Sequence, residues 1–204
     1  MFKDRTDGGR QLAKKLMKYA GQDDVIVIGL PRGGVVTAAE VAKELRAPLD
    51  IIVPRKIGHP GNPELAVGAI SEEGTMIGSV GGVGQEELFK IIEAEKKEAQ
   101  RRLKLYRGKR PPLDLKGKTA ILVDDGIATG ATMKAAIVSA RAKGAKKIVV
   151  AIPVIASDTA GVFEEEADDL VYLQAPLYFG AVGRFYEAFD QTNDDEVIRL
   201  LDSR

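Results

Sequence analysis

Cysteine is absent from the 204-residue sequence, and histidine occurs once, as His59. Without cysteine the chain forms no disulfide, no thiol nucleophile and no cysteine-ligated zinc centre. A single histidine likewise excludes a metal site built from several imidazoles. The chemistry of this protein must be sought in other residue types.

Net charge and long apolar segments are also missing. Lys plus Arg equals Asp plus Glu, at 30 each, which argues against a general binder of nucleic acid or anionic membrane but leaves room for a local anion site. No apolar run approaches the roughly 20 residues of a membrane span, and the opening stretch, MFKDRTDGGRQL, lacks the apolar core of a signal peptide. We therefore expect a cytoplasmic protein that partners neither nucleic acid nor membrane.

Helical and strand patterns alternate along the chain. Helices are predicted over residues 7–20, with Asp7 as candidate N-cap, and over 37–47, 85–107, 132–143, 158–166 and 194–201. Strands are predicted over 25–30, 49–54, 66–70, 75–80, 119–125, 147–155 and 169–175, and the Gly/Pro-rich stretch 57–62 is predicted to be a loop. The repeated β-α-β order predicts one domain over 1–204 with a three-layer, Rossmann-like α/β fold around a mainly parallel sheet.

The stretch VDDGIATGAT, residues 123–132, combines two kinds of chemistry. Asp124 and Asp125 end a strand, and carboxylates accept hydrogen bonds from hydroxyl groups. The following glycines and threonines lead into a helix, whose free N–H groups and dipole favour a phosphate. A sugar phosphate carries both features, so the local chemistry favours a pentose or nucleotide phosphate. A Walker-type nucleotide loop is absent.

The longer stretch ILVDDGIATGATM resembles the phosphoribosyl-pyrophosphate signature of the type I phosphoribosyltransferases. The resemblance implies that Asp124 and Asp125 are catalytic residues that bind the ribose hydroxyls. It also implies a 5′-phosphate loop made of Gly126, Ile127, Ala128, Thr129, Gly130, Ala131 and Thr132. The alternative is an acid pair and a helix cap of the kind common in other α/β proteins, including receiver-type and metal-dependent folds.

The stretch LPRGGVV, residues 30–36, resembles the pyrophosphate loop of the same family. The resemblance implies that Arg32 and the backbone N–H groups around Gly33 and Gly34 hold diphosphate oxygens. It also implies a non-proline cis peptide, at the bond preceding Arg32. Read alone, the two glycines are equally consistent with a simple tight turn.

The stretch VPRKIGHPGNPE, residues 53–64, resembles the start of the flexible loop in adenine phosphoribosyltransferases. Arg55 and Lys56 are thereby candidates to contact the leaving diphosphate, and Lys56 is also a catalytic candidate, while the loop beyond would close over the site. The alternative is a solvated basic pair at a strand end. His59 is predicted to be a loop residue, and Glu64 has no better-founded role.

The acceptor base is expected to bind in a hood, for which the C-terminal tail 174–204, with the 85–107 helix, is the candidate. Phe179, before Val182 and Gly183, lies where purine enzymes of the family place an aromatic that stacks on the base; the alternative is a core residue. The strand 147–155 carries no lysine after its first residue, a departure from the 6-oxopurine enzymes that puts hypoxanthine and guanine in doubt.

The resemblance implies an enzyme of nucleotide metabolism. It would transfer the 5-phosphoribosyl group from phosphoribosyl pyrophosphate to a nitrogenous base, with a purine-like base favoured, and release pyrophosphate. Mg²⁺ is the implied cofactor, held through substrate oxygens and water rather than by direct protein ligands. Two alternatives stay open: a non-catalytic module that senses phosphoribosyl pyrophosphate, and a different Mg²⁺ enzyme with the acid pair on the metal. Family members often dimerise, so a homodimer is a candidate assembly.

Overall fold

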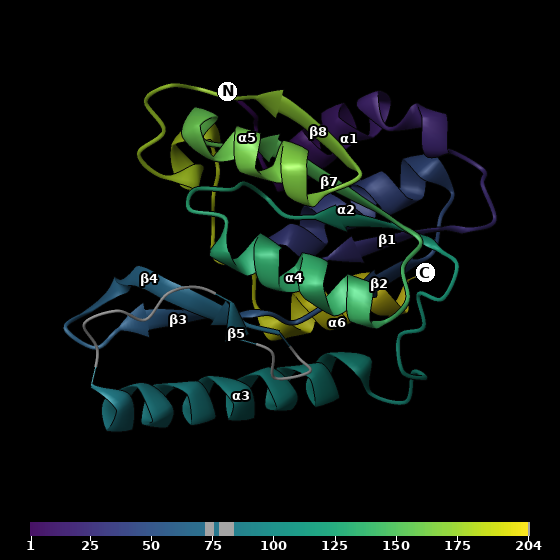
Figure 1. The fold of residues 1–204 in the computed structure, drawn as a ribbon. Helices are drawn as coiled ribbons and strands as arrows, with labels where there is room; N and C mark the ends of the chain where they lie inside the picture. Colours follow the sequence, from purple (N-terminus) through teal and green to yellow (C-terminus); the bar gives the residue numbers. More distant parts are fainter. Residues whose placement is uncertain (72–75, 78–83, 204) are drawn as a thin grey trace.

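The computed structural model, which describes residues 1–71, 76–77 and 84–203, is built around a parallel sheet (Figure 1). Its five strands lie in the order β2-β1-β6-β7-β8, and every neighbouring pair is parallel. The strands are β1 (Val25–Gly29), β2 (Leu49–Ile51), β6 (Thr119–Val123), β7 (Lys147–Val154) and β8 (Asp169–Gln174). The predicted mainly parallel α/β fold is therefore confirmed.

Helices cover both faces of this sheet and make the fold three-layered. One layer contains α1 (Arg5–Lys15), the short helix η1 (Met17–Tyr19), α2 (Gly33–Leu45) and α6 (Asp194–Asp202). The other layer contains α4 (Ala131–Ala142) and α5 (Ser157–Glu166). The strands are apolar on both sides: Val149 and Ala151 of β7 face the first layer, whereas Ile148, Val150 and Ile152 face the second. This pattern explains why the strands read as continuous apolar runs.

A second, antiparallel sheet lies beside the first, in the order β3 (Arg55–His59), β4 (Asn62–Ile70) and β5 (Met76–Ile77). It packs on α3 (Gln85–Arg107), the long helix drawn beneath it in Figure 1. Ile57 and Ile70 are fully buried against Leu88 of this helix. The bounds predicted for α3 are confirmed. No helix of the described residues is long and apolar enough to cross a membrane.

The loop predicted over 57–62 is wrong except at Pro60 and Gly61, which form the hairpin turn, because residues 57–59 belong to β3 and Asn62 begins β4. Gly58 and Pro60 obscured the strand, whose pairing with β4 shifts register on both sides of Gly58. Burial of Ile57 under α3 supplies the stabilisation that local propensity lacks. Of the strand predicted over 75–80, only 76–77 is within the described residues, and the side chain of Glu64 lies outside them.

Several predicted boundaries are also corrected. The N-cap of α1 is Asp4, whose side chain accepts a 2.7 Å hydrogen bond from the backbone of Asp7, so the prediction of Asp7 as cap is wrong. The second helix begins at Gly33, four residues before its predicted start, because its first turn comes from the glycine loop itself. β6 ends at Val123, which leaves Asp124 and Asp125 in the loop that follows.

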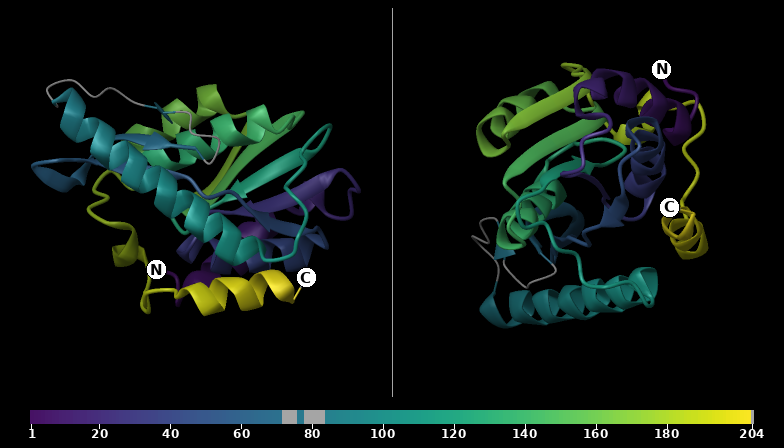
Figure 2. Two further views of the ribbon diagram at one scale, coloured as in Figure 1. Left: turned by 90° about the horizontal axis from the view of Figure 1, so that it is seen from below. Right: turned by 90° about the vertical axis from the view of Figure 1, so that its right-hand side faces the viewer.

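The C-terminal tail returns across the carboxyl edge of the large sheet. Its short helix η2 (Val182–Phe185) leads into a segment that bonds to the N-terminus, where Phe2 exchanges backbone hydrogen bonds with Phe185 and Glu187. The tail ends in α6, which contacts both α2 and α3 (Figure 2). Tyr106 of α3 donates a 2.6 Å hydrogen bond to Asp194, the first residue of α6. The tail thereby ties the two ends of the chain and α3 to the core.

Two glycine-to-alanine changes in helices are expected to have opposite effects on stability. A methyl group at Gly9 of α1 would lie 2.6 Å from the backbone oxygen of Thr37 in α2, so Gly9→Ala should destabilise the protein by about 1–3 kcal/mol. Gly161 of α5 has no atom within 4 Å of the same position, so Gly161→Ala should stabilise by about 0.5–1 kcal/mol. Chemical denaturation measures both; equal effects would contradict the tight α1–α2 contact.

Candidate functional site

The site is formed where two neighbouring parallel strands end. β1 and β6 pair so that Gly29 lies opposite Val123, and the backbone N–H of Leu30 donates to the oxygen of Val123 at 3.0 Å. The loops that leave these strands, 30–34 and 124–130, therefore begin side by side. In open α/β sheets, ligands bind at this carboxyl edge. The structure thus brings the predicted pyrophosphate loop against the predicted acid pair.

Gly33 and Gly34 make this contact possible because they lack side chains. A methyl group at Gly34 would lie 2.6 Å from Oδ1 of Asp124, and one at Gly33 would collide with Oδ2 of Asp125 and lie 2.6 Å from Nε of Arg5. The glycines therefore do more than form a turn: they let α2 begin directly against the two acids. The peptide bond between Pro31 and Arg32 is cis, which confirms the prediction for this bond.

The predicted 5′-phosphate loop surrounds a small hollow at the start of α4. The hollow has a volume of about 170 Å³ and is lined by Asp124, Gly126, Ile127, Ala128, Thr129, Gly130, Ala131, Thr132, Met133 and Val182. Gly130 is the N-cap of α4 and has a left-handed backbone with φ 78°. Free N–H groups of the first helical turn, together with the helix dipole, favour an anion here. The volume suits a single phosphate group better than a whole nucleotide.

The rest of the fold holds the phosphate loop in place. The backbone N–H of Ile127 donates to Val154 of β7, and the oxygen of Ile127 accepts from Ala156, both at 2.9 Å. The Thr159 hydroxyl donates to the oxygen of Ala128 at 2.7 Å. A methyl group at Gly130 would lie 2.7 Å from the Phe163 ring. These contacts leave the loop little freedom, so its N–H groups are oriented before any ligand arrives.

The two acids have different surroundings. Asp124 lines the phosphate hollow, and its Oδ1 accepts a 2.8 Å hydrogen bond from the backbone N–H of Asp125. Oδ2 of Asp125 forms a 2.7 Å ion pair with Nε of Arg5. Burial, and secondarily the neighbouring charge of Asp125, raises the pKa of Asp124 well above its usual value. Burial also raises the pKa of Asp125, although the charge of Arg5 opposes that rise.

Arg5 and Tyr186 are residues of the site that the sequence did not reveal. Arg5 begins α1, 120 positions from Asp125 in the chain, and Tyr186 of the tail donates its hydroxyl to the backbone oxygen of Asp125. Neither stretch carries a motif that points to the acid pair, because only the tertiary fold brings these segments to β6. Val182 joins them as the tail residue that lines the phosphate hollow.

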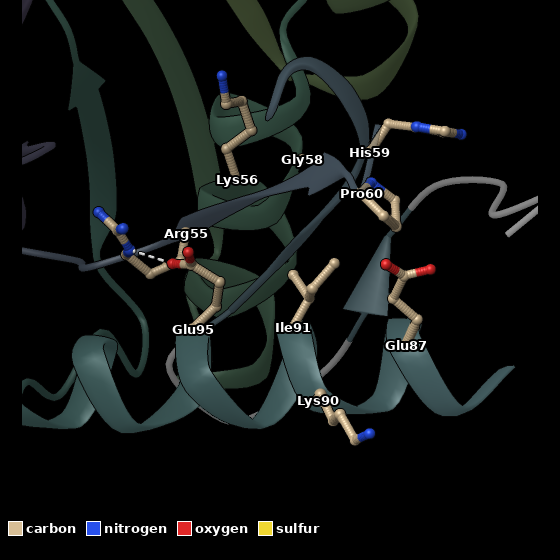
Figure 3. Close-up of a pocket in the computed structure, with 9 residues that line it drawn as sticks. All are labelled: Arg55, Lys56, Gly58, His59, Pro60, Glu87, Lys90, Ile91 and Glu95. Atoms are coloured by element: carbon tan, nitrogen blue, oxygen red, sulfur yellow. Dashed lines mark hydrogen bonds and ion pairs between the residues drawn. The ribbon is translucent and has the colours of Figure 1, made fainter. Parts of the chain in front are cut away.

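Two of the basic residues predicted to contact the diphosphate, Arg32 and Arg55, lie near acidic residues of the protein. Arg32 lies 3.7 Å from Asp194 of α6, and Arg55 forms a 2.7 Å ion pair with Glu95 of α3. Figure 3 shows Arg55 turned toward Glu95, whereas Lys56 extends from the opposite side of β3. The hollow of about 540 Å³ on the α3 side is lined by Arg55, Lys56, Gly58, His59, Pro60, Glu87, Lys90, Ile91 and Glu95.

His59 and Phe179 both make contacts within the protein. Nδ1 of His59 accepts a 3.0 Å hydrogen bond from the backbone of Gly61, at the tip of the β3–β4 hairpin. Phe179 is only 9% exposed, and its ring centroid lies 5.2 Å from that of Phe185. Its neighbour Tyr178 is 95% exposed. The stacking role of Phe179 stays a prediction, and in this conformation its ring packs in an aromatic cluster.

The donor set of the site limits how it would hold a metal. Among residues 1–71, 76–77 and 84–203, no group of three or more His, Asp or Glu side chains is placed to hold an ion. Asp125 is already paired with Arg5, which leaves Asp124 as the carboxylate that lines the hollow. Such a site fits Mg²⁺ only if substrate oxygens and water supply most of its ligands, as is common for this ion.

Comparisons with known proteins establish the family of the chain. The family model of the phosphoribosyl transferase domain matches residues 2–188. Two Mycobacterium tuberculosis proteins described as putative phosphoribosyl transferases, from strains CDC 1551 and H37Rv, are each 48% identical over 99% of this chain. The match covers 46% of those proteins, so the chain spans about half the length of the curated relatives.

Solved structures give the same result for the fold. The crystal structure of TT1426 from Thermus thermophilus is 38% identical and has a TM-score of 0.82, with 98% of this chain and 97% of that chain covered. The AQ2163 protein from Aquifex aeolicus, at 11% identity and a TM-score of 0.52 over 84% of this chain and 74% of that one, shares the fold alone. The chain belongs to the phosphoribosyl transferase domain family.

Proposed function

We propose that this chain binds phosphoribosyl pyrophosphate at the carboxyl edge of β1 and β6 and transfers its 5-phosphoribosyl group to a nitrogenous base. The observation that carries the proposal is the placement of Asp124 between the phosphate hollow at α4 and the glycine loop at α2. The ligand has a 5′-phosphate, ribose hydroxyls and a diphosphate, and these three parts match the hollow, the acid pair and the glycine loop. Membership of the family supports this assignment.

In the proposed reaction, the bond between ribose C1 and the diphosphate oxygen breaks, and a bond from C1 to a nitrogen of the base forms. Pyrophosphate leaves with the bonding electrons, and the transition state resembles an oxocarbenium ion. Carboxylates of the acid pair accept hydrogen bonds from the ribose hydroxyls, while the α4 N-terminus holds the 5′-phosphate. Mg²⁺ supplies charge neutralisation on the diphosphate. The protein thus acts by positioning and electrostatic stabilisation.

Groups of the glycine loop and of β3 are assigned to the leaving diphosphate. The backbone N–H groups at the start of α2, around Gly33 and Gly34, lie beside the acid pair because the two loops are in close contact. Arg32 and Lys56 supply positive charge in this proposal. Arg32 is also paired with Asp194 of α6, so its use by substrate would compete with that 3.7 Å contact.

The acceptor is proposed to be a purine-like base that is not a 6-oxopurine. After Lys147, β7 continues as apolar residues and one proline, so it offers no lysine to read a 6-oxo group. The tail, which lines the phosphate hollow through Val182, is the adjoining segment that supplies aromatic side chains. Adenine is therefore the first base to test.

Incubation with phosphoribosyl pyrophosphate, Mg²⁺ and a panel of bases tests the reaction. One base should drive pyrophosphate release, and Asp125→Asn should reduce that release at least tenfold because a carboxylate that contacts the ribose becomes a neutral amide. Asp23→Asn, on an exposed turn away from the site, is the matched control and should retain full activity. Ligand binding without turnover by any base would favour the sensing alternative. Absence of binding would refute both.

Asp124→Asn is expected to raise stability while weakening ligand binding. The pKa of the folded carboxyl is raised, so above the ordinary aspartate pKa of about 3.9 the folded state resists an ionisation that the unfolded state undergoes freely. Stability therefore falls as pH rises until Asp124 ionises in the fold. The asparagine, which can still accept from the backbone of Asp125, should gain on the order of 1 kcal/mol at pH 8.

That gain in stability should shrink near pH 4, because Asp124 is protonated in the folded state there and about half protonated in the unfolded state. Chemical denaturation of wild type and Asp124→Asn at pH 4 and pH 8 measures the difference, and Asp23→Asn serves again as the exposed control. A loss of stability at pH 8, or a gain of equal size at both pH values, would contradict the raised pKa.

A further inference from the structure

Arg5 is a tightly held cation beside the acid pair. Its side chain is 12% exposed, and its guanidinium makes three separate contacts. Nε donates to Oδ2 of Asp125 at 2.7 Å, Nη1 donates to the backbone oxygen of Asp190 at 2.7 Å, and the carbon of the group lies 3.7 Å from the ring centroid of Phe189. A planar, forked guanidinium suits this combination, whereas an ammonium group does not.

The same ion pair also contacts the glycine loop. A side chain at Gly33 would collide with Oδ2 of Asp125 and with Nε of Arg5, so both atoms of the ion pair lie against the first residue of α2. Arg5 thus stands where four segments meet: its own helix α1, the loop after β6, the start of α2 and the C-terminal tail. A residue with only a surface role would not be in contact with all of them.

We propose that Arg5 is a positioning residue for phosphoribosyl pyrophosphate, which fixes the Asp125 carboxylate and, through Gly33, the start of the diphosphate loop. The inference rests on the proposed function for its ligand, while the Arg5–Asp125 pair itself is open to a separate measurement. Asp124 carries no such cation partner in the described structure and lines the hollow. The two acids therefore differ: Arg5 holds Asp125 in position, whereas Asp124 lines the phosphate hollow.

Burial raises the pKa of both acids, and the charge of Arg5 opposes that rise. The groups that face Asp125 are Arg5 from α1, Asp124 from the same loop and the hydroxyl of Tyr186 from the tail, while α2 presents Gly33, which has no side chain. Arg5 is the single cation among them. Its removal would leave two neighbouring carboxyls without a compensating charge, and an opposite charge at this range shifts a carboxyl pKa by about 1–3 units.

Carboxyl-carbon NMR of the full chain tests this directly, without any ligand. In Arg5→Gln, the titration of the acid pair should move by about one pH unit or more toward higher pH. Arg5→Lys keeps the charge and should restore most of the wild-type titration. Arg10→Gln is the matched control on the same helix, because Arg10 pairs with Glu40 at 2.9 Å and is 57% exposed, and it should leave the acid pair unchanged. An unshifted titration in folded Arg5→Gln overturns the proposal.

Calorimetric binding of phosphoribosyl pyrophosphate with Mg²⁺ then tests positioning. Arg5→Gln should weaken binding at least tenfold at pH 7, and Arg5→Lys about threefold or more, because lysine cannot hold both Asp125 and the Asp190 oxygen in one fork. If Arg5→Gln does not fold, Arg5→Lys decides: wild-type affinity in that variant overturns the positioning role. If the wild type binds no phosphoribosyl pyrophosphate at any pH, the proposed function fails, and the NMR titration still decides whether Arg5 controls the acid pair.

Discussion

The contact between the loops after β1 and β6 is the constraint on which the site depends. Parallel pairing of the two strands makes their loops leave the sheet as neighbours, with Gly29 opposite Val123. The loops approach so closely that positions 33 and 34 accept no side chain. The helix α2 therefore begins directly against Asp124 and Asp125, and α4 begins on the other side of the same acids. Two helix N-termini and two carboxylates converge there because of backbone packing.

This convergence buries the carboxylates of Asp124 and Asp125. Arg5 forms an ion pair with Asp125. Burial raises the pKa of both acids, and the Arg5 guanidinium opposes the rise at Asp125. The arrangement costs stability in the folded state. In the proposed function, the acid pair and the neighbouring helix N-terminus bind the two ends of a sugar phosphate. Elements outside the central sheet share in the compensation: α1 supplies Arg5, and the tail supplies the hydroxyl of Tyr186 and the ring of Phe189.

Acidic residues of α6 and α3 also pair with the basic side chains of Arg32 and Arg55. Asp194 of α6 lies near Arg32, and Glu95 of α3 holds Arg55, so both predicted diphosphate contacts are paired with acids from elements far away in the sequence. Tyr106 of α3 bonds to the same Asp194. Around the site, α3 thus contacts both the small sheet and the tail. The relatives from Mycobacterium tuberculosis are about twice as long as this chain, so a further segment accompanies the matching part there.

Local patterns in the sequence were sufficient for the parallel sheet and the bounds of α3, because each depends on residues close together in the chain. They also indicated the acid pair and the 126–132 loop, whose ligand-binding roles stay predictions. The resemblance to the family was sufficient for the cis bond before Arg32. Only the tertiary structure decided the β3–β4 hairpin, whose glycine and proline residues obscure a strand that burial of Ile57 stabilises. It alone also decided the Asp4 cap, the packing of Phe179 and the place of Arg5. These features depend on contacts such as Arg5 with Asp125, 120 positions apart, and no local pattern of residues records such a contact.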